Sequence, residues 1–448
     1  MASTSLYRTP SSTGNRQKFT LSVWCKKHSS SQMSFLGAGA SNQQNHIQFA
    51  DDRFQIRYYT NTNNTIVNTK RLLRDPSAWY HLVCSVDTTQ STASNRVKLY
   101  VNGELAELND TTYPGQNGTW DFNLSGTTMY VGRRGHSNAY IYDGVMSHLH
   151  WIDGTAYDAS PFGSTDSTTG QWKINVEPSV TYGTNGFFLF KDNAALTDQS
   201  GNSNNFTLSA GTLTKTEDTP DNVFNTLNRV AANQFTLSNG DTTATVSGQS
   251  FVRTFITNTI APESGKWYWE SKLITSGGSD RTSLGICSTE ENVGDGQVIP
   301  QNELSIATGY SRIRFTENGS TTEVDSFYTV PSANDIFMYA LDLDNNKFYF
   351  GVNGNWWNYN SSQTGGDPTS GSGYVTNSTN IIKGAMSAFI RVQAGAAATT
   401  FTNSFNFGNG FFGTTAVSSA GTNASGFGIF EYNVPTGYTA LCTKGLNL

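Results

Sequence analysis

Residues 337–354 read FMYALDLDNNKFYFGVNG, and this stretch decides the fold class. Large apolar residues stand at alternate positions of 337–343 and again of 348–352, which is the period of a strand with one buried face. The segments 344–346 (Asp-Asn-Asn) and 353–354 (Asn-Gly) supply turns, since Asn and Gly tolerate positive φ. The stretch therefore predicts an antiparallel hairpin that continues into a second tight turn.

The first half of the chain shows the same pattern of alternating apolar residues and turn residues. Alternating apolar residues occupy 19–25, 80–86 and 97–101, and Asn102-Gly103 follows the last of them. Several such runs with turn signals between them predict an all-β fold. The two Val-Asn-Gly turns lie about 250 residues apart, too far for a solenoid or propeller repeat. We therefore expect two antiparallel β-sandwich (jelly-roll) domains in tandem, each with its own hairpin.

The boundary between them is expected within 209–227, where Ser, Gly, Thr, Asp and Pro cluster. All six histidines precede it. The predicted organisation is an N-terminal arm at 1–18, a sandwich at 19–212, a linker at 213–227 and a second sandwich at 228–448. The arm is polar and lacks alternation, and Tyr7 and Pro10 are its candidate anchors.

Composition excludes several protein classes. Charged residues make up 14% of the 448 residues, the net charge is −6 and aromatics reach 12%. Such a chain is too aromatic for a disordered protein and too acidic for a typical nucleic-acid-binding domain. No window approaches about 18 uninterrupted apolar residues, so membrane insertion is not expected. The first thirty residues lack the apolar core of a signal peptide, so we expect no Sec-type secretion.

The four cysteines are Cys25, Cys84, Cys287 and Cys442. No two are spaced for a zinc knuckle. Cys25 and Cys84 lie in apolar strand-like runs, which favours reduced, buried thiols. One disulfide inside the first domain is the alternative.

Catalytic signals are sparse. A retaining glycosidase needs two carboxyls about 5–5.5 Å apart, and the nearest candidate is Glu323-Val324-Asp325, with no third acid after it. There is no Gly-x-Ser-x-Gly elbow and no phosphate loop. We therefore expect a protein that is not an enzyme.

Metal signals are equally weak. His148 and His150 would share one face of a strand, but without a third ligand such a pair is usually structural. Calcium is conceivable through Asp51-Asp52 and Asp143-Gly144, although no calcium-loop motif exists. We assign no cofactor and leave calcium without ligands.

Aromatic residues near turns are the candidates for ligand recognition, since sugar rings have apolar faces that pack on aromatic rings. Trp356 and Trp357 open a Gly/Ser/Asp-rich loop at 358–373, and strand alternation would send their rings to opposite faces. Trp120 and Tyr140 are the candidates in the first domain. The alternative is that these rings pack onto the sandwiches.

Two stretches resemble known domain families. The first resembles a laminin-G-like, concanavalin A-like jelly roll, and its carriers are FTLSVW (19–24), WYHLV (79–83), VKLYVNG (97–103) and YDGVM (142–146). The second resembles a SPRY domain through SGKWYWE (264–270), LGI (284–286), ALDLD (340–344), FYFGVNG (348–354) and FNFG (405–408). These are core, turn and sheet residues, so the resemblance implies fold more than site.

The chain is also similar to a group of tailed-phage virion proteins, many from marine phages. The carriers are SLYRTPSS (5–12), HWIDG (150–154) with PFG (161–163), and VPTGYTALC (434–442). In that group an acid more often stands at the position of His148, which speaks against a metal site there.

This resemblance implies a non-enzymatic protein of the virion surface, assembled in the host cytoplasm. The expected role is a tail-fibre or spike subunit that binds host-surface polysaccharide. The expected partners are other virion proteins and further copies of the chain, with a trimer implied by analogy alone. The alternatives are a structural or decoration protein of capsid or tail that makes protein–protein contacts, and a glycan depolymerase.

Overall fold

The structure is a computed structural model. It describes residues 4–39, 43–60, 64–191, 195–232, 234–247, 253–276, 281–288, 302–307, 312–325, 331–359, 364–375, 381–382, 384–393 and 400–447. Their regular structure is strand, apart from short 3-10 helices: η1 (Ala93–Asn95), η2 (Ser160–Phe162), η3 (Arg229–Ala231) and η4 (Gly445–Asn447). The all-β prediction is confirmed. Within these ranges there is no helix long and apolar enough to cross a membrane.

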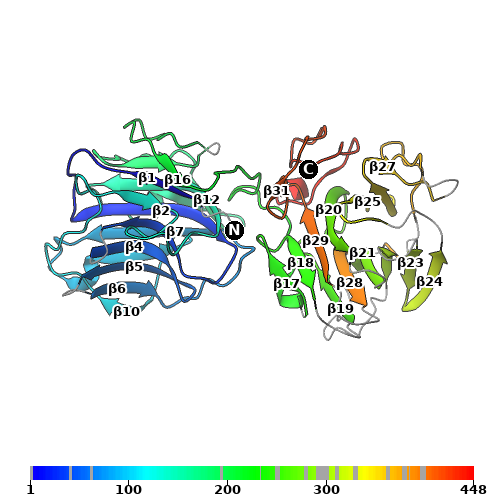
Figure 1. Cartoon of the computed structure of the whole chain (residues 1–448), viewed down its shortest axis with the longest axis horizontal. Coiled ribbons are helices and arrows are strands. Elements are labelled where there is room, and N and C mark those ends of the chain that lie inside the picture. The colour runs from blue at the N-terminus through cyan, green and yellow to red at the C-terminus, as the bar shows by residue number, and fades with distance from the viewer. Residues whose placement is uncertain are drawn as a thin grey trace. The chain divides into compact units, whose positions relative to one another are not determined.

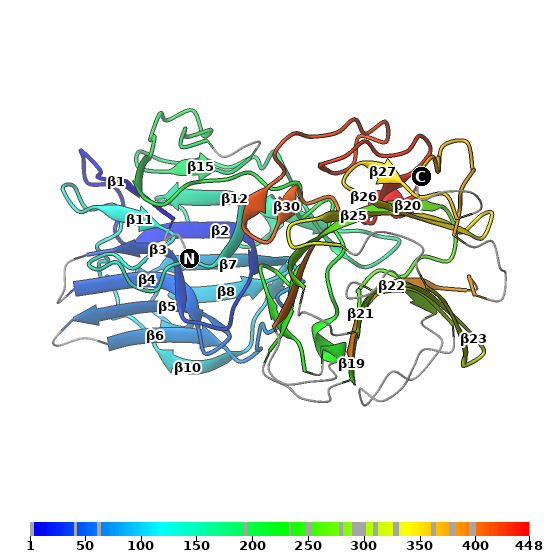
Figure 2. The same ribbon diagram turned by 45° about the vertical axis from the view of Figure 1, so that its right-hand side comes forward.

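The chain divides into two compact units, Met1–Lys215 and Thr216–Leu448 (Figure 1). The first unit packs two antiparallel sheets against each other. Sheet A has the strand order β10 (Leu108–Thr112), β6 (Asn64–Thr69), β5 (Arg53–Thr60), β4 (Gln43–Ala50), β3 (Met33–Ala38), β11 (Met129–Val131), β1 (Ser5–Arg8) and β16 (Thr207–Ala210). Figure 2 shows β11, β3, β4, β5, β6 and β10 in succession.

Sheet B forms the second layer of this unit. Its strand order is β15 (Phe187–Leu189), β12 (Gly144–Asp153), β2 (Lys18–Lys27), β7 (Tyr80–Asp87), β8 (Val97–Val101) and β9 (Glu104–Leu105). The hairpin of β13 (Gly163–Thr165) and β14 (Trp172–Ile174) lies within the segment that covers the outer face of sheet B, where Phe162 and Trp172 pack on Val83 and Ile152. The core lies between the sheets, because every second residue of each strand points inward.

The second unit has the same two-layer plan. Sheet C has the order β17 (Thr236–Ser238), β18 (Thr243–Val246), β29 (Phe401–Asn406), β20 (Lys266–Ser276), β25 (Ile336–Asp342), β26 (Lys347–Val352) and β27 (Asn355–Trp356), with β32 (Thr439–Ala440) parallel to β20. Sheet D has the order β19 (Arg253–Thr257), β28 (Met386–Gln393), β21 (Arg281–Ser288), β22 (Glu303–Ala307), β23 (Arg312–Glu317) and β24 (Ser320–Asp325). A small hairpin joins β30 (Phe411–Phe412) and β31 (Thr415–Ala416).

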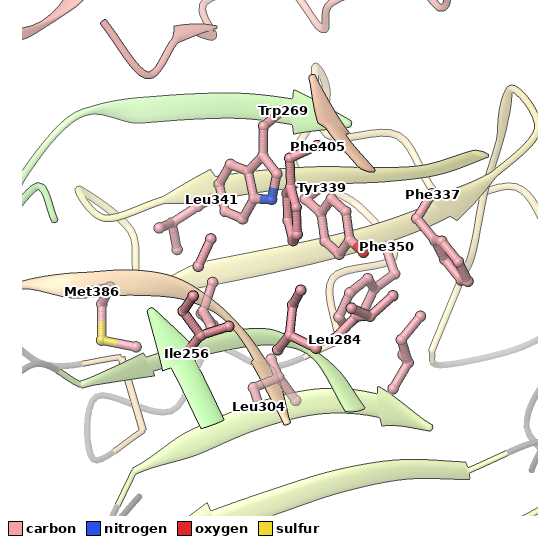
Figure 3. Packing of buried hydrophobic residues seen from close by; sticks show 14 of the residues in the cluster. Ile256, Trp269, Leu284, Leu304, Phe337, Tyr339, Leu341, Phe350, Met386 and Phe405 are labelled. Carbon is pink, nitrogen blue, oxygen red and sulfur yellow. The ribbon is translucent and has the colours of Figure 1, made fainter. Parts of the chain in front are cut away.

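Side chains from both sheets interdigitate in the core of the second unit. Figure 3 shows residues of sheet C (Trp269, Tyr339, Leu341 and Phe405) opposite residues of sheet D (Ile256, Leu284, Leu304 and Met386). Residues 337–343 behave as predicted, since Phe337, Tyr339 and Leu341 all enter this core. The layer is therefore built from the alternation that is visible in the sequence.

The predicted Asn-Gly turns are confirmed at both places. Asn102 and Gly103 have φ of 49° and 83°, and Asn353 and Gly354 have φ of 49° and 84°. Positive φ at both central residues matches the twist of the strands that such a turn joins. The prediction for Cys25 and Cys84 is also confirmed, since both thiols are buried and neither forms a disulfide.

Two predicted boundaries are wrong. Residues 5–8 of the predicted arm form β1, which pairs with β11 and β16, and Leu6 is 2% exposed in the core. Four residues are too few for alternation to show in the sequence. The second half of the predicted linker is also packed, because Phe224 and Leu227 are buried in the second unit.

Candidate functional site

The tandem tryptophans at β27 do not form an exposed platform. Trp357 is 6% exposed and belongs to the core between sheets C and D, where it lies beside Phe350. Trp356 points to the opposite face, as alternation predicts, and is half-buried, with its ring centroid 6.2 Å from that of Tyr268. The prediction at Trp357 is corrected, because its ring lies in the core and cannot stack on a sugar. Trp356 is half-buried and stays a prediction.

The two candidates of the first unit differ from each other. Trp120 is 1% exposed and packs on Phe19 and Tyr58, so its ring cannot stack on a sugar, and this candidate is wrong. Tyr140 is half-buried at the surface of sheet A, with its ring centroid 6.3 Å from that of His46. Tyr140 therefore stays a candidate.

The histidine pair of β12 lies together, with ring centroids 6.4 Å apart. His150 hydrogen bonds to the hydroxyl of Tyr182 (2.8 Å) and stacks on Phe188 at 4.0 Å. Burial, and then the neighbouring His148, hold the pKa of His150 well below its usual value, so this ring is neutral. Within the described ranges no three His, Cys, Asp or Glu side chains converge as a metal site would require. Packing beneath the segment that covers the outer face of sheet B is a sufficient reason for these two histidines.

The carboxylates singled out by sequence are engaged by cations. Glu323 forms ion pairs with Arg312 and Arg314 of the adjacent strand β23, and the side chain of Asp325 lies outside the described residues. An ion-paired strand edge is a sufficient reason for the acid at position 323.

The calcium candidates likewise lie beside basic side chains. Asp52 forms ion pairs with Lys27 and Arg74, and a carboxylate oxygen of Asp143 lies 3.9 Å from Nδ1 of His28. Calcium ligation would require these carboxylates to leave such partners.

A different surface, on the outer face of sheet A, collects residues that the sequence analysis largely missed. Core residues such as Ile47 and Ile56 face sheet B, and the residues that alternate with the core residues along each strand face outward. One row of cross-strand neighbours runs through Tyr7 (β1), Tyr130 (β11), Gly37 (β3), His46 (β4) and Arg57 (β5). We call this row, together with Tyr59, Arg133, Arg134, His136 and Tyr140, the arginine–tyrosine face.

The loop 132–140 lies across this row, and two glycines allow it to do so. A Cβ at Gly37 would lie 2.6 Å from the backbone nitrogen of Gly135 and 2.7 Å from the carbonyl oxygen of Arg133. The backbone N–H of Ser34 donates to the carbonyl of Tyr140 (2.8 Å), which fastens the far end of the loop to β3. The loop thereby places two arginines, a histidine and a tyrosine above the sheet.

Each arginine of the face is held against a tyrosine ring. Tyr7 and Tyr59 are each 37% exposed, so part of this aromatic surface faces solvent. Cation–π contacts of this kind form within about 6 Å of the ring centroid. The three pairs, with their guanidinium-to-centroid distances, are Arg133 on Tyr130 (3.7 Å), Arg134 on Tyr140 (4.8 Å) and Arg57 on Tyr59 (5.5 Å).

The face is positively charged although the whole chain is acidic. Burial, together with the charges of Arg134, His136 and Arg57, lowers the pKa of His46 to about 3. Burial also lowers the pKa of His136, again with help from Arg134 and Arg133. Both imidazoles are therefore neutral near pH 7, and the charge of the face comes from its arginines.

A sequence signal for this face exists. Gly132-Arg133-Arg134-Gly135 places two arginines between two glycines in a chain that has few charges, directly after a short apolar strand. The cross-strand row itself could not be read, because its members come from five strands whose order in the sheet the sequence does not reveal.

Comparison with known proteins supports the fold of the first unit. Residues 2–160 match the laminin G family model described as the concanavalin A-like lectin/glucanases superfamily. Every residue of the arginine–tyrosine face lies within this range. The resemblance of the first domain to laminin-G-like, concanavalin A-like proteins is confirmed there. No curated protein sequence matches the chain.

Solved structures of similar fold share little sequence with the chain. The human HERC1 SPRY domain has 10% identity and a TM-score of 0.27, covering 38% of this chain and 91% of that chain. Domains LG4-5 of the mouse laminin alpha1 chain have 9% identity and a TM-score of 0.29, covering 90% and 84%. The CBM40 of the Ruminococcus gnavus IT-sialidase, bound to sialyllactose, has 17% identity and a TM-score of 0.23, covering 29% and 72%.

Proposed function

We propose that this chain binds glycans through the arginine–tyrosine face of its first unit. The observation that carries the proposal is the row of partly exposed tyrosine rings beside stacked guanidinium groups on one sheet face. Tyrosine offers an apolar ring face with a polar tip, and arginine offers several donors in a fixed plane. A sugar presents the complementary surfaces, C–H faces and hydroxyl groups. The matched family model, which names lectins, also supports the proposal.

We further propose that the chain is a non-enzymatic adhesin on the surface of a phage particle, in a tail fibre or spike. The support is the similarity of SLYRTPSS (5–12) and VPTGYTALC (434–442) to tailed-phage virion proteins. Copies arrayed on one particle turn weak single sites into strong attachment, since each further contact is intramolecular. A small glycan-binding site such as the arginine–tyrosine face is compatible with attachment through many copies.

The test is a glycan array and a whole-cell binding assay with the full-length protein, combined with analysis of the glycan products. We expect saturable binding, intact glycans, and loss of binding in the double variant Tyr7→Ala/Tyr59→Ala. Leu105→Ala is the matched control, because Leu105 is 60% exposed on sheet B of the same unit.

Three outcomes would contradict the proposal. Unchanged binding by a folded Tyr7→Ala/Tyr59→Ala variant would remove the site. Shortened glycans would favour the depolymerase alternative. Absence of binding to glycans and cells, with binding to purified capsids or tails, would favour the structural alternative.

A further inference from the structure

The arginine–tyrosine face carries positive charge that no carboxylate of the described residues balances. Among the described residues, Arg57, Arg133 and Arg134 form no ion pair with an acid. The charged neighbours that act on His46 are all basic, and so are those that act on His136. In sequence, residues 40–42 and 61–63 read ASN and NTN and contain no acid.

This imbalance differs from the surroundings of three arginines that the fold pairs with an acid. Arg16 pairs with Asp121, Arg229 with Asp241 and Arg391 with Glu303. Where the fold brings arginine side chains close to one another, a counter-charge is expected to come from an acid of the chain or from a ligand.

Hydrogen-bond donors of the face also lack partners. Among the described residues, the Nε atoms of Arg57, Arg133 and Arg134 are buried without a hydrogen-bond partner, and so is the ring nitrogen Nδ1 of His136. Buried polar groups are normally hydrogen-bonded, so several unpaired donors on one face are unusual. With Nε closed off by the fold, a guanidinium group binds a planar or tetrahedral oxyanion through the donors of its Nη atoms.

The guanidinium groups are held in place before any ligand arrives. Tyr140 and Tyr59 support Arg134 and Arg57 by stacking, and the contact of Gly37 with Gly135 fixes the loop that carries Arg134. Arg57 and Arg134 are also close enough for the charge of one to act on the other. A rigid pair of forks loses little conformational entropy on binding.

We propose that the ligand of the arginine–tyrosine face is an acidic glycan, whose carboxylate or sulfate groups are bound by Arg57 and Arg134 while its sugar rings pack on the tyrosines. This inference rests on the proposed function and adds the chemical class of the glycan. It explains why a chain of net charge −6 gathers arginines on one face of one sheet.

The test compares binding of the full-length protein to a uronic-acid polymer (polygalacturonate), a sulfated polymer (dextran sulfate) and an uncharged polymer (dextran). We expect tighter binding to the two acidic polymers and binding weakened about tenfold or more in Arg57→Gln/Arg134→Gln, the loss expected for a charge-assisted hydrogen bond. Arg71→Gln is the matched control, because Arg71 is exposed in the same unit and outside the face. Arg57→Lys/Arg134→Lys should retain part of the binding.

A second arm separates the acidic sugar from a free anion. Galacturonate should compete for the polymer better than inorganic sulfate at the same ionic strength, and the thermal midpoint of Arg57→Gln/Arg134→Gln should not fall below that of the wild type. Stronger competition by inorganic sulfate would reduce the face to a simple anion site and overturn the proposal.

Two further results distinguish the failures. Equal binding of all three polymers by the wild type and by the double variant would overturn the acidic-glycan inference while leaving glycan binding intact. Absence of binding to any glycan on the array would overturn the proposed function, and this inference with it.

Discussion

The outer face of sheet A in the first unit is polar and cationic, whereas the outer face of sheet C in the second unit is apolar and covered by the chain itself. Tyr268, Met338, Tyr349 and Trp356 point outward from sheet C. Four aromatic or aliphatic residues near the C-terminus pack on them: Phe430, Tyr432, Val434 and Tyr438. Sheet C thus has core on both faces, and sheet A on one.

The polar groups of the two faces show the same contrast. Glu270 is completely buried on the covered face, and its carboxylate accepts hydrogen bonds from the backbone N–H groups of Glu431 and Tyr432 and from the hydroxyl of Tyr268. On sheet A, by contrast, the Nε atoms of Arg57 and Arg134 have no hydrogen-bond partner in the part of the chain that the structure describes. The buried acid of the covered face thus receives its donors from the chain itself, whereas the arginines of the arginine–tyrosine face have no acidic partner among the described residues.

The largest expected effect is the loss of an anchor of the covered face. Phe430 is 1% exposed and meets Tyr268 edge-on with centroids 4.9 Å apart, so Phe430→Ala should lower the free energy of unfolding of the second unit by about 3–5 kcal/mol. Tyr59→Ala on the arginine–tyrosine face should cost less than about 1 kcal/mol. Urea denaturation measures both. Equal losses of unfolding free energy would mean that the arginine–tyrosine face contributes to stability as much as the covered face does.

The next effect is a pH dependence that belongs to the covered face. Burial raises the pKa of Glu270 to about 7, and the N–H and hydroxyl donors only partly oppose this. Between pH 4.5 and 7 the unfolded chain ionises this group while the folded chain keeps its proton, so stability should fall as pH rises, by about 3 kcal/mol in all.

Hydrogen exchange of the β20 and β25 amides across this pH range measures the effect. Glu270→Gln should flatten the slope, while Glu263→Gln should leave it unchanged because Glu263 is exposed. A second unit that becomes more stable from pH 4.5 to 7 would show that Glu270 is ionised in the folded chain.

Most of the strands and turns could be predicted from local sequence patterns. Alternation at 19–25, 80–86 and 337–343 predicted strands that the structure contains, and two Asn-Gly pairs predicted hairpin turns with positive φ. These features depend on neighbours in sequence, which a sequence displays directly. The four-residue strand β1 escaped notice because its partners β11 and β16 come more than a hundred residues later.

The candidate site could be predicted much less well, because it depends on contacts between distant parts of the chain. Whether Trp120 or Trp357 is exposed depends on which layer covers it, and that depends on segments far away in the chain. Tyr140 was found because it stands in a polar loop, but its partner His46 lies on a strand ninety-four positions earlier. Sheet order, which creates the cross-strand row, is a property of the whole fold.

A smaller effect should follow from closing the space at Gly37. An alanine Cβ there would overlap backbone atoms of Gly135 and Arg133, so Gly37→Ala should displace loop 132–140 and cost about 1–3 kcal/mol. Glycan binding should weaken as Arg134 moves. Gly115→Ala is the matched control, because a Cβ at Gly115 has nothing within 4 Å. Thermal denaturation and the binding assay together check this. A Gly37→Ala variant that binds glycan normally would show that loop 132–140 is not part of the binding site.

The smallest expected effect tests the unbalanced charge directly. Arg57 has basic neighbours and no acidic partner among the described residues, so Arg57→Gln should change the free energy of unfolding by less than about 0.5 kcal/mol, or raise it as repulsion is relieved. Arg391→Gln is the contrasting variant, since it would leave Glu303 charged and completely buried, which costs about 3–5 kcal/mol. Denaturant titration of both variants measures the difference. A marked loss of stability in Arg57→Gln would make the arginine a part of the fold, because a group kept for a ligand contributes its binding energy only when that ligand is present.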